Sequence, residues 1–140
     1  MGFASAERIW VLDTNVVVSG MLSPSGPPGR LLDMVLLRQL TLAVDDRILS
    51  EYREVLERPK FAIAAGRLQA FFGIMAFQRN VVAPPVAGMA ALEEADTMFP
   101  EVAAVSGQVL VTGNLRHFPE NTRRTVEVLS PTEAWQRLQA

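Results

Sequence analysis

The sequence has 140 residues, of which 49% are hydrophobic and 20% charged, the length and composition of one compact domain with a hydrophobic core. It contains no cysteine, which excludes disulfide bridges and thiolate metal sites, and no apolar run approaches membrane-spanning length. The formal net charge of -2 counts against a module that only binds nucleic acid, although all but one of the 13 basic residues are arginines, which suit phosphate recognition. We therefore expect a single domain over residues 1–140, located in the cytoplasm and without a membrane partner.

The first predicted element is a buried strand, Ile9–Leu12, which ends at Asp13, Thr14 and Asn15. Ligands of open parallel sheets bind just beyond the carboxyl ends of the strands, so Asp13 is a candidate functional residue. A strand-end aspartate more often caps a turn or a helix. Which of these two roles Asp13 has depends on the other candidate residues of the chain.

A helix and a strand are predicted in the next part of the chain. No element is predicted for the apolar residues 16–22, and the turn residues at 23–26 predict a loop. Apolar residues at helical spacing predict a first helix over Pro28–Gln39, since proline is tolerated in a first turn. A short strand, Leu40–Val44, is expected to follow.

The second predicted helix carries a candidate acid, Glu51. Asp45 or Asp46 is expected to cap this helix, and Arg58-Pro59 is expected to end it. At about 100° per residue, Glu51 flanks the apolar stripe of the helix, and it is therefore the acid nearest to the core. The ordinary explanation is an ion pair with Arg47, four residues earlier.

The third predicted helix, Gly66–Asn80, has an apolar surface broad enough for two partners. That surface consists of Leu68, Phe71, Phe72, Ile74, Met75 and Phe77. We expect Phe71, Phe72 and Met75 to belong to the core, and the remaining surface could bind a partner protein. The two valines that follow are too few to predict a strand, and residues 83–88 predict a connecting loop.

Pro100 constrains the start of the next helix. Because proline is tolerated in a first turn and breaks a helix interior, the helix is expected to begin near Asp96 and to end at Gly107. The Asp96 carboxylate would then lie at a positive helix end, on the same face as Phe99, whereas Glu101 faces the opposite way. An aspartate at such a position is most often an N-cap.

Residues 108–111 predict another buried strand that ends in small polar residues, among them Thr112 and Asn114. If this strand is parallel and adjacent to Ile9–Leu12, the two polar ends meet at one edge of the sheet. His117 is expected to be structural or to contact substrate, because no second histidine exists to complete a histidine-rich metal site.

The chain is expected to end in a strand and a helix. Val126–Leu129 predicts the strand, and Ser130-Pro131-Thr132-Glu133 is a capping box that opens the terminal helix. Arg123 and Arg124, just before this strand, are expected to be solvated charges. The alternation of strands and helices predicts an α/β fold with a parallel sheet covered by helices on both faces.

The candidate site residues all carry oxygen donors and are expected at one polar edge: Asp13, Glu51, Asp96, Thr112 and Asn114. Oxygen ligands without histidine or cysteine select hard cations such as Mg²⁺ or Mn²⁺. Such ions lower the pKa of a bound water and stabilise the leaving oxygen of a phosphodiester. Carboxylates this close would repel one another without a cation.

Four stretches, taken in order, resemble the PIN domain family. They are Val11-Leu12-Asp13-Thr14-Asn15, Leu49-Ser50-Glu51-Tyr52, Asp96 with the Met98–Ala103 stretch after it, and Leu110-Val111-Thr112-Gly113-Asn114 with Arg116-His117-Phe118-Pro119. The ordered set covers nearly the whole chain, and the branch that it resembles most is the toxins of toxin–antitoxin pairs related to VapC. The resemblance implies a three-layer α/β/α sandwich with a central, mainly parallel sheet.

The resemblance also implies a metal-dependent ribonuclease in which Asp13, Glu51 and Asp96 bind Mg²⁺ or Mn²⁺. Many PIN domains carry a fourth acid where this chain has Asn114, whose amide oxygen can ligate a metal but brings no charge. Ala95 and Pro100 also depart from the acidic and leucine-rich pattern of the toxin branch.

We hypothesise an endoribonuclease that cleaves single-stranded RNA with a metal-activated water. Asp13, Glu51, Asp96 and Asn114 form its catalytic set, and the residues expected to order the site or contact RNA are Asn15, Thr112, Arg116, Arg30 and Arg53. The resemblance further implies an antitoxin partner and a homodimer or higher homo-oligomer.

Two alternatives remain open. Asn114 and the lack of a basic surface favour a catalytically quiet PIN domain that binds RNA or a protein. A strand ending in Asp13 and a later one ending in Thr112 also resemble haloacid-dehalogenase-like phosphatases. That family needs a second aspartate where this chain has Asn15, a lysine after the threonine strand and a further acidic metal motif, and the sequence lacks all three.

Overall fold

The computed structural model of the protein describes residues 8–83 and 94–140, and of residues 94–96 and 121 it describes only the backbone. The predicted connecting loop over residues 83–88 therefore lies, except for Ala83, outside the described residues.

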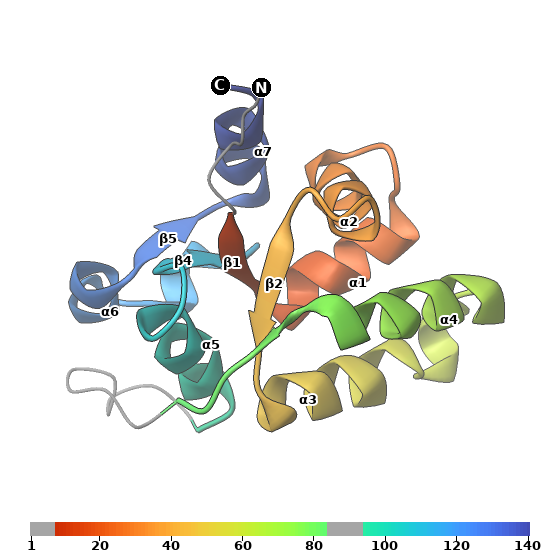
Figure 1. The fold of residues 1–140 in the computed structure, drawn as a ribbon, viewed down its shortest axis with the longest axis horizontal. Coiled ribbons are helices and arrows are strands. Elements are labelled where there is room, and N and C mark those ends of the chain that lie inside the picture. Colours follow the sequence, from red (N-terminus) through yellow and green to blue (C-terminus); the bar gives the residue numbers. More distant parts are fainter. Residues whose placement is uncertain (1–7, 84–93) are drawn as a thin grey trace.

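A five-stranded parallel sheet forms the centre of the fold, with the strand order β3-β2-β1-β4-β5 (Figure 1). Its strands are β1 (Ile9–Leu12), β2 (Thr41–Val44), β3 (Arg79–Asn80), β4 (Val109–Val111) and β5 (Glu127–Leu129). The central strand β1 pairs with β2 on one side and with β4 on the other, with Leu12 opposite Val111. The predicted parallel sheet is thus confirmed, and it brings the carboxyl ends of β1 and β4 together.

The helices cover both faces of the sheet. In the described residues they are α1 (Thr14–Leu22), α2 (Pro27–Leu36), α3 (Asp46–Leu56), α4 (Ala65–Ile74), α5 (Glu94–Ala104), α6 (Glu120–Thr125) and α7 (Pro131–Gln139). Crossovers between parallel strands are right-handed as a rule, so the step from β1 to β2 to β3 is expected to put α1 to α4 on one face. The return to β4 and β5 runs the other way across the sheet and is expected to put α5 and α6 on the opposite face. The contacts agree, since α5 packs on β1, β2 and β4 while α2 packs between α1 and α7 (Figure 1). The three-layer α/β/α architecture is confirmed.

Two predicted helix caps are present in the structure. The Asp45 carboxylate accepts a hydrogen bond of 3.0 Å from the Ile48 N–H at the start of α3. Ser130 and Glu133 form the reciprocal capping box of α7, with Pro131 at its first position. These local patterns are read correctly from the sequence because each cap satisfies N–H groups that a helix start leaves unpaired.

Helix α1 is the main element for which the sequence yielded no prediction. Its valines are β-branched and carry no strong helical period, so intrinsic preference does not favour a helix there. Val16 and Val17 are nevertheless fully buried. At Gly20 a β-carbon would lie only 2.6 Å from the Leu32 side chain, so α1 and α2 approach closely there. Tertiary packing therefore outweighs local preference in α1.

The prediction of one helix over Gly66–Asn80 is wrong at its end. Helix α4 stops at Ile74, a 3₁₀ turn (η2, Met75–Phe77) follows, and the chain then pairs with β2 as the edge strand β3. Gln78 makes this change of direction specific, because its side chain accepts from the Leu42 N–H at 2.7 Å and donates to the Ile74 carbonyl at 3.0 Å. A strand of two exposed residues has no apolar alternation that a sequence pattern could reveal.

The aromatic surface of α4 and η2 divides between core and solvent. Phe71 and Met75 are buried, as expected, and Phe72 is half-buried. Phe77 is 62% exposed, and the Arg38 guanidinium lies 3.8 Å from its ring centroid. Only part of the predicted partner surface therefore remains available.

In the described residues α5 runs over Glu94–Ala104, so its start lies near Asp96 as expected, but Pro100 lies in the helix interior and not in the first turn. Proline lacks an N–H, so the carbonyl of residue 96 receives no helical hydrogen bond from residue 100. Pro100, Phe99 and Val102 are all buried under the sheet. Packing of this face offsets the lost hydrogen bond.

Arg123 is more than a solvated charge. Its guanidinium donates to the carbonyls of Leu115, at 2.7 Å, and of Phe118, at 3.1 Å, and so ties α6 to the 3₁₀ turn η3 (Leu115–His117). Arg124 forms only an exposed ion pair with Glu120 at 3.6 Å. His117 lies exposed on η3.

Across the described ranges, every helix is too short or too polar to cross a lipid bilayer.

Gly107 provides a test of the packing between β1 and the turn that precedes β4. A β-carbon built on Gly107 would lie 1.6 Å from the Ile9 carbonyl oxygen, so Gly107→Ala should lower the free energy of unfolding by about 3 kcal/mol or more. Gly73 in α4 has nothing within 4 Å of such a β-carbon, and Gly73→Ala should raise the free energy of unfolding by about 0.5–1 kcal/mol. Urea unfolding of both variants measures the contrast. Equal effects of the two substitutions would contradict this packing.

Candidate active site

The site begins where β1 passes into α1 with Asp13 as the only residue between them. The Asp13 N–H donates to the Val111 carbonyl at 2.9 Å and so continues the pairing between β1 and β4 by one residue. Asp13 occupies the N-cap position of α1, but its side chain makes no hydrogen bond of N-cap geometry, although the N–H groups of Thr14 and Asn15 lie near enough to favour its charged form. Capping of α1, the ordinary explanation for this aspartate, therefore does not account for the position of its carboxylate.

The Asp13 carboxylate instead contacts polar side chains at the ends of β4 and β1. Its Oδ2 atom accepts from the Thr112 hydroxyl at 2.8 Å and from the Asn15 amide at 3.4 Å. Thr112 is fully buried, and its hydroxyl also accepts from the Asn114 N–H at 3.1 Å. The Asn15 side chain accepts from the Gly113 N–H at 3.0 Å. The two polar strand ends are thus tied together, as the parallel pairing predicted.

Glu51 reaches the same edge from α3. The Thr14 hydroxyl, in the first turn of α1, donates to Glu51 Oε2, and the next residue on α3, Tyr52, donates its hydroxyl to the Leu12 carbonyl. The alternative that Glu51 pairs with Arg47 is wrong, because Arg47 bonds to Asp45 and Glu101 instead. Two adjacent residues of α3 therefore hold it against the end of β1.

The negative charges of Asp13 and Glu51 affect the pKa values of the groups at this edge. Burial is the largest cause that raises the pKa of Asp13, and the negative charge of Glu51 raises it further. The Thr112 hydroxyl and the N–H groups of Thr14 and Asn15 oppose this shift without cancelling it. The pKa of Tyr52 lies well above its usual range, because of burial first and the two carboxylates second. Tyr52 therefore remains a neutral donor, and Asp13 carries a charge that lacks full compensation.

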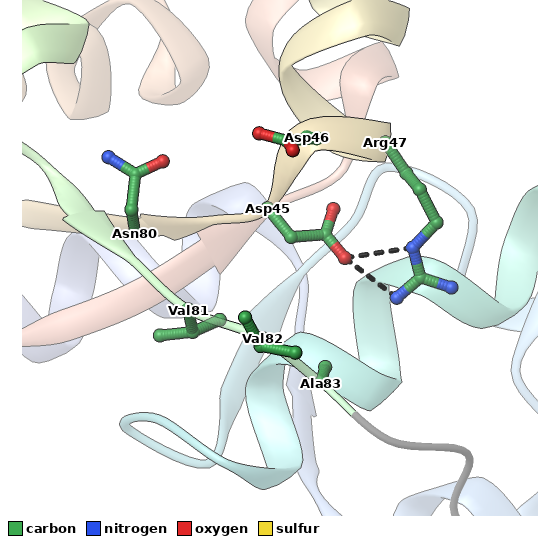
Figure 2. Close-up of a pocket in the computed structure, with 7 residues that line it drawn as sticks. All are labelled: Asp45, Asp46, Arg47, Asn80, Val81, Val82 and Ala83. Carbon is green, nitrogen blue, oxygen red and sulfur yellow. Dashed lines mark hydrogen bonds and ion pairs between the residues drawn. The ribbon is translucent and has the colours of Figure 1, made fainter.

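Asp45 and Glu101 form a neighbouring acidic group in which an arginine pairs with both carboxylates. Arg47 lies 2.7 Å from the first carboxylate and 2.8 Å from the second, and both carboxylates are at least 90% buried. Asp45 and Arg47 line a cavity of about 410 Å³ at the ends of β2 and β3, where Val81 and Asn80 form the opposite wall (Figure 2). Because one guanidinium bonds to both carboxylates, this group is suited to joining α3 with α5.

The remaining predicted residues are Asp96 and three arginines. The Asp96 side chain lies outside the described residues, although its backbone belongs to α5. Arg30 and Arg116 are exposed, and Arg53 lies with its guanidinium 4.3 Å from the Phe72 ring centroid. Among the described residues, no hydrogen bond or ion pair links these arginines to Asp13 or Glu51. Their predicted contact with phosphate stays a prediction.

The chemistry of the donors fits a hard cation. Asp13 and Glu51 offer carboxylate oxygens, the Asn15 and Asn114 amides follow the same two strands, and the uncompensated charge on Asp13 is what a divalent ion would neutralise. Among the described side chains, which exclude that of Asp96, no group of three acidic or histidine residues is close enough to hold a metal. A complete site therefore needs a further donor, and Asp96 is the predicted one.

Thr14 and Tyr52 are site residues that the sequence did not single out. In the sequence, Thr14 is a small polar residue at a strand end, and Tyr52 lies at a helical spacing that fits the apolar stripe of its helix. A signal for Tyr52 was present, because a buried tyrosine hydroxyl needs an acceptor. No comparable signal identifies Thr14, since its position depends on the unpredicted helix α1.

A groove of about 450 Å³ opens beside the acid pair. The wall formed by α1 consists of Thr14, Asn15 and Ser19. The opposite wall consists of Glu51 and Arg58, together with Phe61 of the 3₁₀ turn η1 (Pro59–Phe61). Thr14 and Glu51 thus belong both to the hydrogen-bonded site and to the wall of the groove.

Comparison with known proteins identifies similar sequences. The family model described as PIN domain matches residues 10–116. The uncharacterized protein MJ1680 of Methanocaldococcus jannaschii is 27% identical over 107 residues, a match that covers 74% of this chain and 69% of that protein. The matched region of the family model includes Asp13, Glu51, Asp96 and Asn114.

The raised pKa of Asp13 leads to a stability test on metal-free protein. Because the folded state favours the protonated carboxyl, stability is lost as the pH rises above the ordinary value of 3.8 and through the raised pKa. Asp13→Asn removes this ionisation but keeps an oxygen that can accept from Thr112. The variant should therefore unfold at a higher denaturant concentration than the parent protein at pH 7 with EDTA, and this advantage should shrink toward pH 3. An advantage that does not change with pH would contradict the electrostatic explanation.

Proposed function

The chain belongs to the PIN domain family, and on this premise we propose that it is a Mg²⁺- or Mn²⁺-dependent endoribonuclease that cleaves single-stranded RNA. PIN domains are generally nucleases that use divalent metal ions, so the family supports a nuclease kind of activity. One observation carries the finer proposal: Asp13 and Glu51 converge on one edge of the sheet without a cationic side chain between them.

The chain's own residues would act by positioning. Thr112 orients the Asp13 carboxylate, and Thr14 orients that of Glu51, so both acids are held by hydroxyl groups of fixed elements. With Asp96 they would hold the ion, and the Asn114 amide would complete the set. When bound, the ion would activate a water for attack on the phosphodiester and stabilise the negative charge that develops there.

We further propose that the protein is the toxin of a toxin–antitoxin pair. The support is the resemblance of its ordered motifs to VapC-related toxins, which also implies an antitoxin partner and a homodimer or higher homo-oligomer.

The second candidate function is a catalytically quiet PIN domain that binds RNA or protein. The observation that favours it is Asn114, which stands where many PIN domains have a fourth acid. Titration with Mn²⁺ separates the two candidates, since the quiet domain should bind no divalent ion at millimolar concentration.

Cleavage of a labelled single-stranded RNA in the presence of Mn²⁺ tests the catalytic role of the acid pair. Asp13→Asn and Glu51→Gln should each lower the rate roughly 100-fold or more, because each removes a charged ligand. Asp33→Asn and Glu57→Gln, which make the same chemical changes at exposed positions, should leave the rate unaffected. Activity that survives Asp13→Asn or chelation by EDTA would overturn the mechanism.

Asn114→Asp tests whether residue 114 faces the ion. The N–H of this residue bonds to Thr112, which in turn holds Asp13, so a carboxylate at position 114 would add negative charge beside the acid pair. We expect Mn²⁺ to bind on the order of tenfold more tightly, as measured by calorimetry, and the metal-free variant to be less stable. Unchanged affinity together with unchanged stability would place the side chain away from the site.

A further inference from the structure

The groove beside the acid pair has the chemistry of a nucleic-acid binding site. It begins at Thr14 and Glu51, which already belong to the candidate active site, and it extends along α3 to Arg58 and Phe61. An acidic residue, Glu51, therefore lies at one end of the groove, and a basic residue with an aromatic ring lies at the other. This polarity suits an extended polyanion with one phosphate at the ion and the next part of the strand on the basic end.

Phe61 is held in a fixed position at the far end of the groove. Arg58-Pro59 ends α3, and the turn that follows is closed by hydrogen bonds from the Phe61 N–H to the Arg58 carbonyl, at 3.1 Å, and from the Ala62 N–H to the Pro59 carbonyl, at 3.0 Å. Ala62 then adopts a left-handed conformation, with φ of 50°, which turns the chain away. The ring is half-buried, so one part remains open to the groove. A partly exposed ring carried on a hydrogen-bonded turn among polar residues is a platform on which a base can stack.

Arg58 and Lys60 supply positive charge at the same turn. The Arg58 side chain is 45% exposed and pairs with Glu54 at 3.2 Å, and an exposed pair of this kind contributes little stability. The guanidinium can therefore exchange this partner for a phosphate at small cost. Lys60, the chain's only lysine, lies with its ammonium 5.1 Å from the Phe61 ring centroid.

We propose that this groove binds single-stranded RNA next to the scissile phosphate, with Phe61 stacking on a base and Arg58 contacting a phosphate. The proposal rests on the proposed ribonuclease function, because it takes the acid pair as the point of cleavage. A single strand fits better than a duplex, since a base can stack on Phe61 only when it is free of its own helix. Asn15 and Ser19, polar residues on the α1 wall, are placed to hydrogen-bond with the sugar or base.

Binding of a fluorescent single-stranded RNA of about a dozen nucleotides, followed by anisotropy in EDTA, tests the groove separately from catalysis. Phe61→Ala should weaken binding roughly tenfold, whereas Phe61→Trp should retain it, because stacking needs only a flat ring. Arg58→Gln should weaken binding and reduce the dependence of log Kd on log salt by about one. Circular dichroism and thermal unfolding establish that each variant is folded.

Two matched controls lie outside the groove. Phe77 is an exposed aromatic residue beneath a basic side chain, and Arg124 is an exposed arginine in an i,i+4 pair, so they reproduce the settings of Phe61 and Arg58. Phe77→Ala and Arg124→Gln should leave RNA affinity unchanged. In Mn²⁺-dependent cleavage, Phe61→Ala should raise KM with little change in kcat.

The outcomes separate the two proposals. RNA affinity that is the same in Phe61→Ala as in the parent protein, or a duplex that binds as well as a single strand, would overturn the groove assignment even if the protein cleaves RNA. A parent protein that binds RNA through Phe61 but cleaves none with Mn²⁺ would overturn the ribonuclease function and leave RNA binding by the groove supported.

Discussion

The direct passage of β1 into α1 is the constraint on which the rest of the site depends. Asp13 is the only residue between the two elements, and its N–H is bonded to Val111 of the neighbouring strand. The carbonyl just before it accepts from Tyr52, which brings α3 and with it Glu51 to the same point. Both candidate ligands thus take their positions from the central strand of the sheet. Preorganisation of this kind removes the need to order flexible loops when an ion or substrate binds.

Charge compensation distinguishes two acidic groups at the same edge of the sheet. Asp45 and Glu101 share Arg47, and the three side chains form a closed ionic network between α3 and α5. Within the described residues, Asp13 and Glu51 receive only hydroxyl and amide donors, and mutual repulsion contributes to the raised pKa of Asp13. An uncompensated pair is unfavourable for folding and favourable for binding a cation, which is the pattern expected of a functional site.

Sequence patterns predicted the parts of this structure that follow from local chemistry. The strand ending at Asp13, the helix carrying Glu51 and the strand ending at Thr112 could all be read, because apolar period and strand ends are local features. Helix α1, strand β3 and the interior position of Pro100 could not, because each depends on packing between distant segments. The groove was missed for the same reason. Phe61 and Arg58 were recognisable only as the residues around a helix end, and their relation to α1 exists only in the folded chain.

Because the acid pair is attached to the central strand, its geometry is more constrained than that of the groove wall. Asp13 and Thr112 belong to the same hydrogen-bonded unit as β1 and β4, so they cannot loosen unless the sheet itself opens. The far wall of the groove is a surface turn outside the sheet, held by two short-range hydrogen bonds. Substitutions in this turn would alter the ligand preference of the groove with little effect on the stability of the core. The reaction chemistry and the choice of target could therefore diverge at separate rates during evolution.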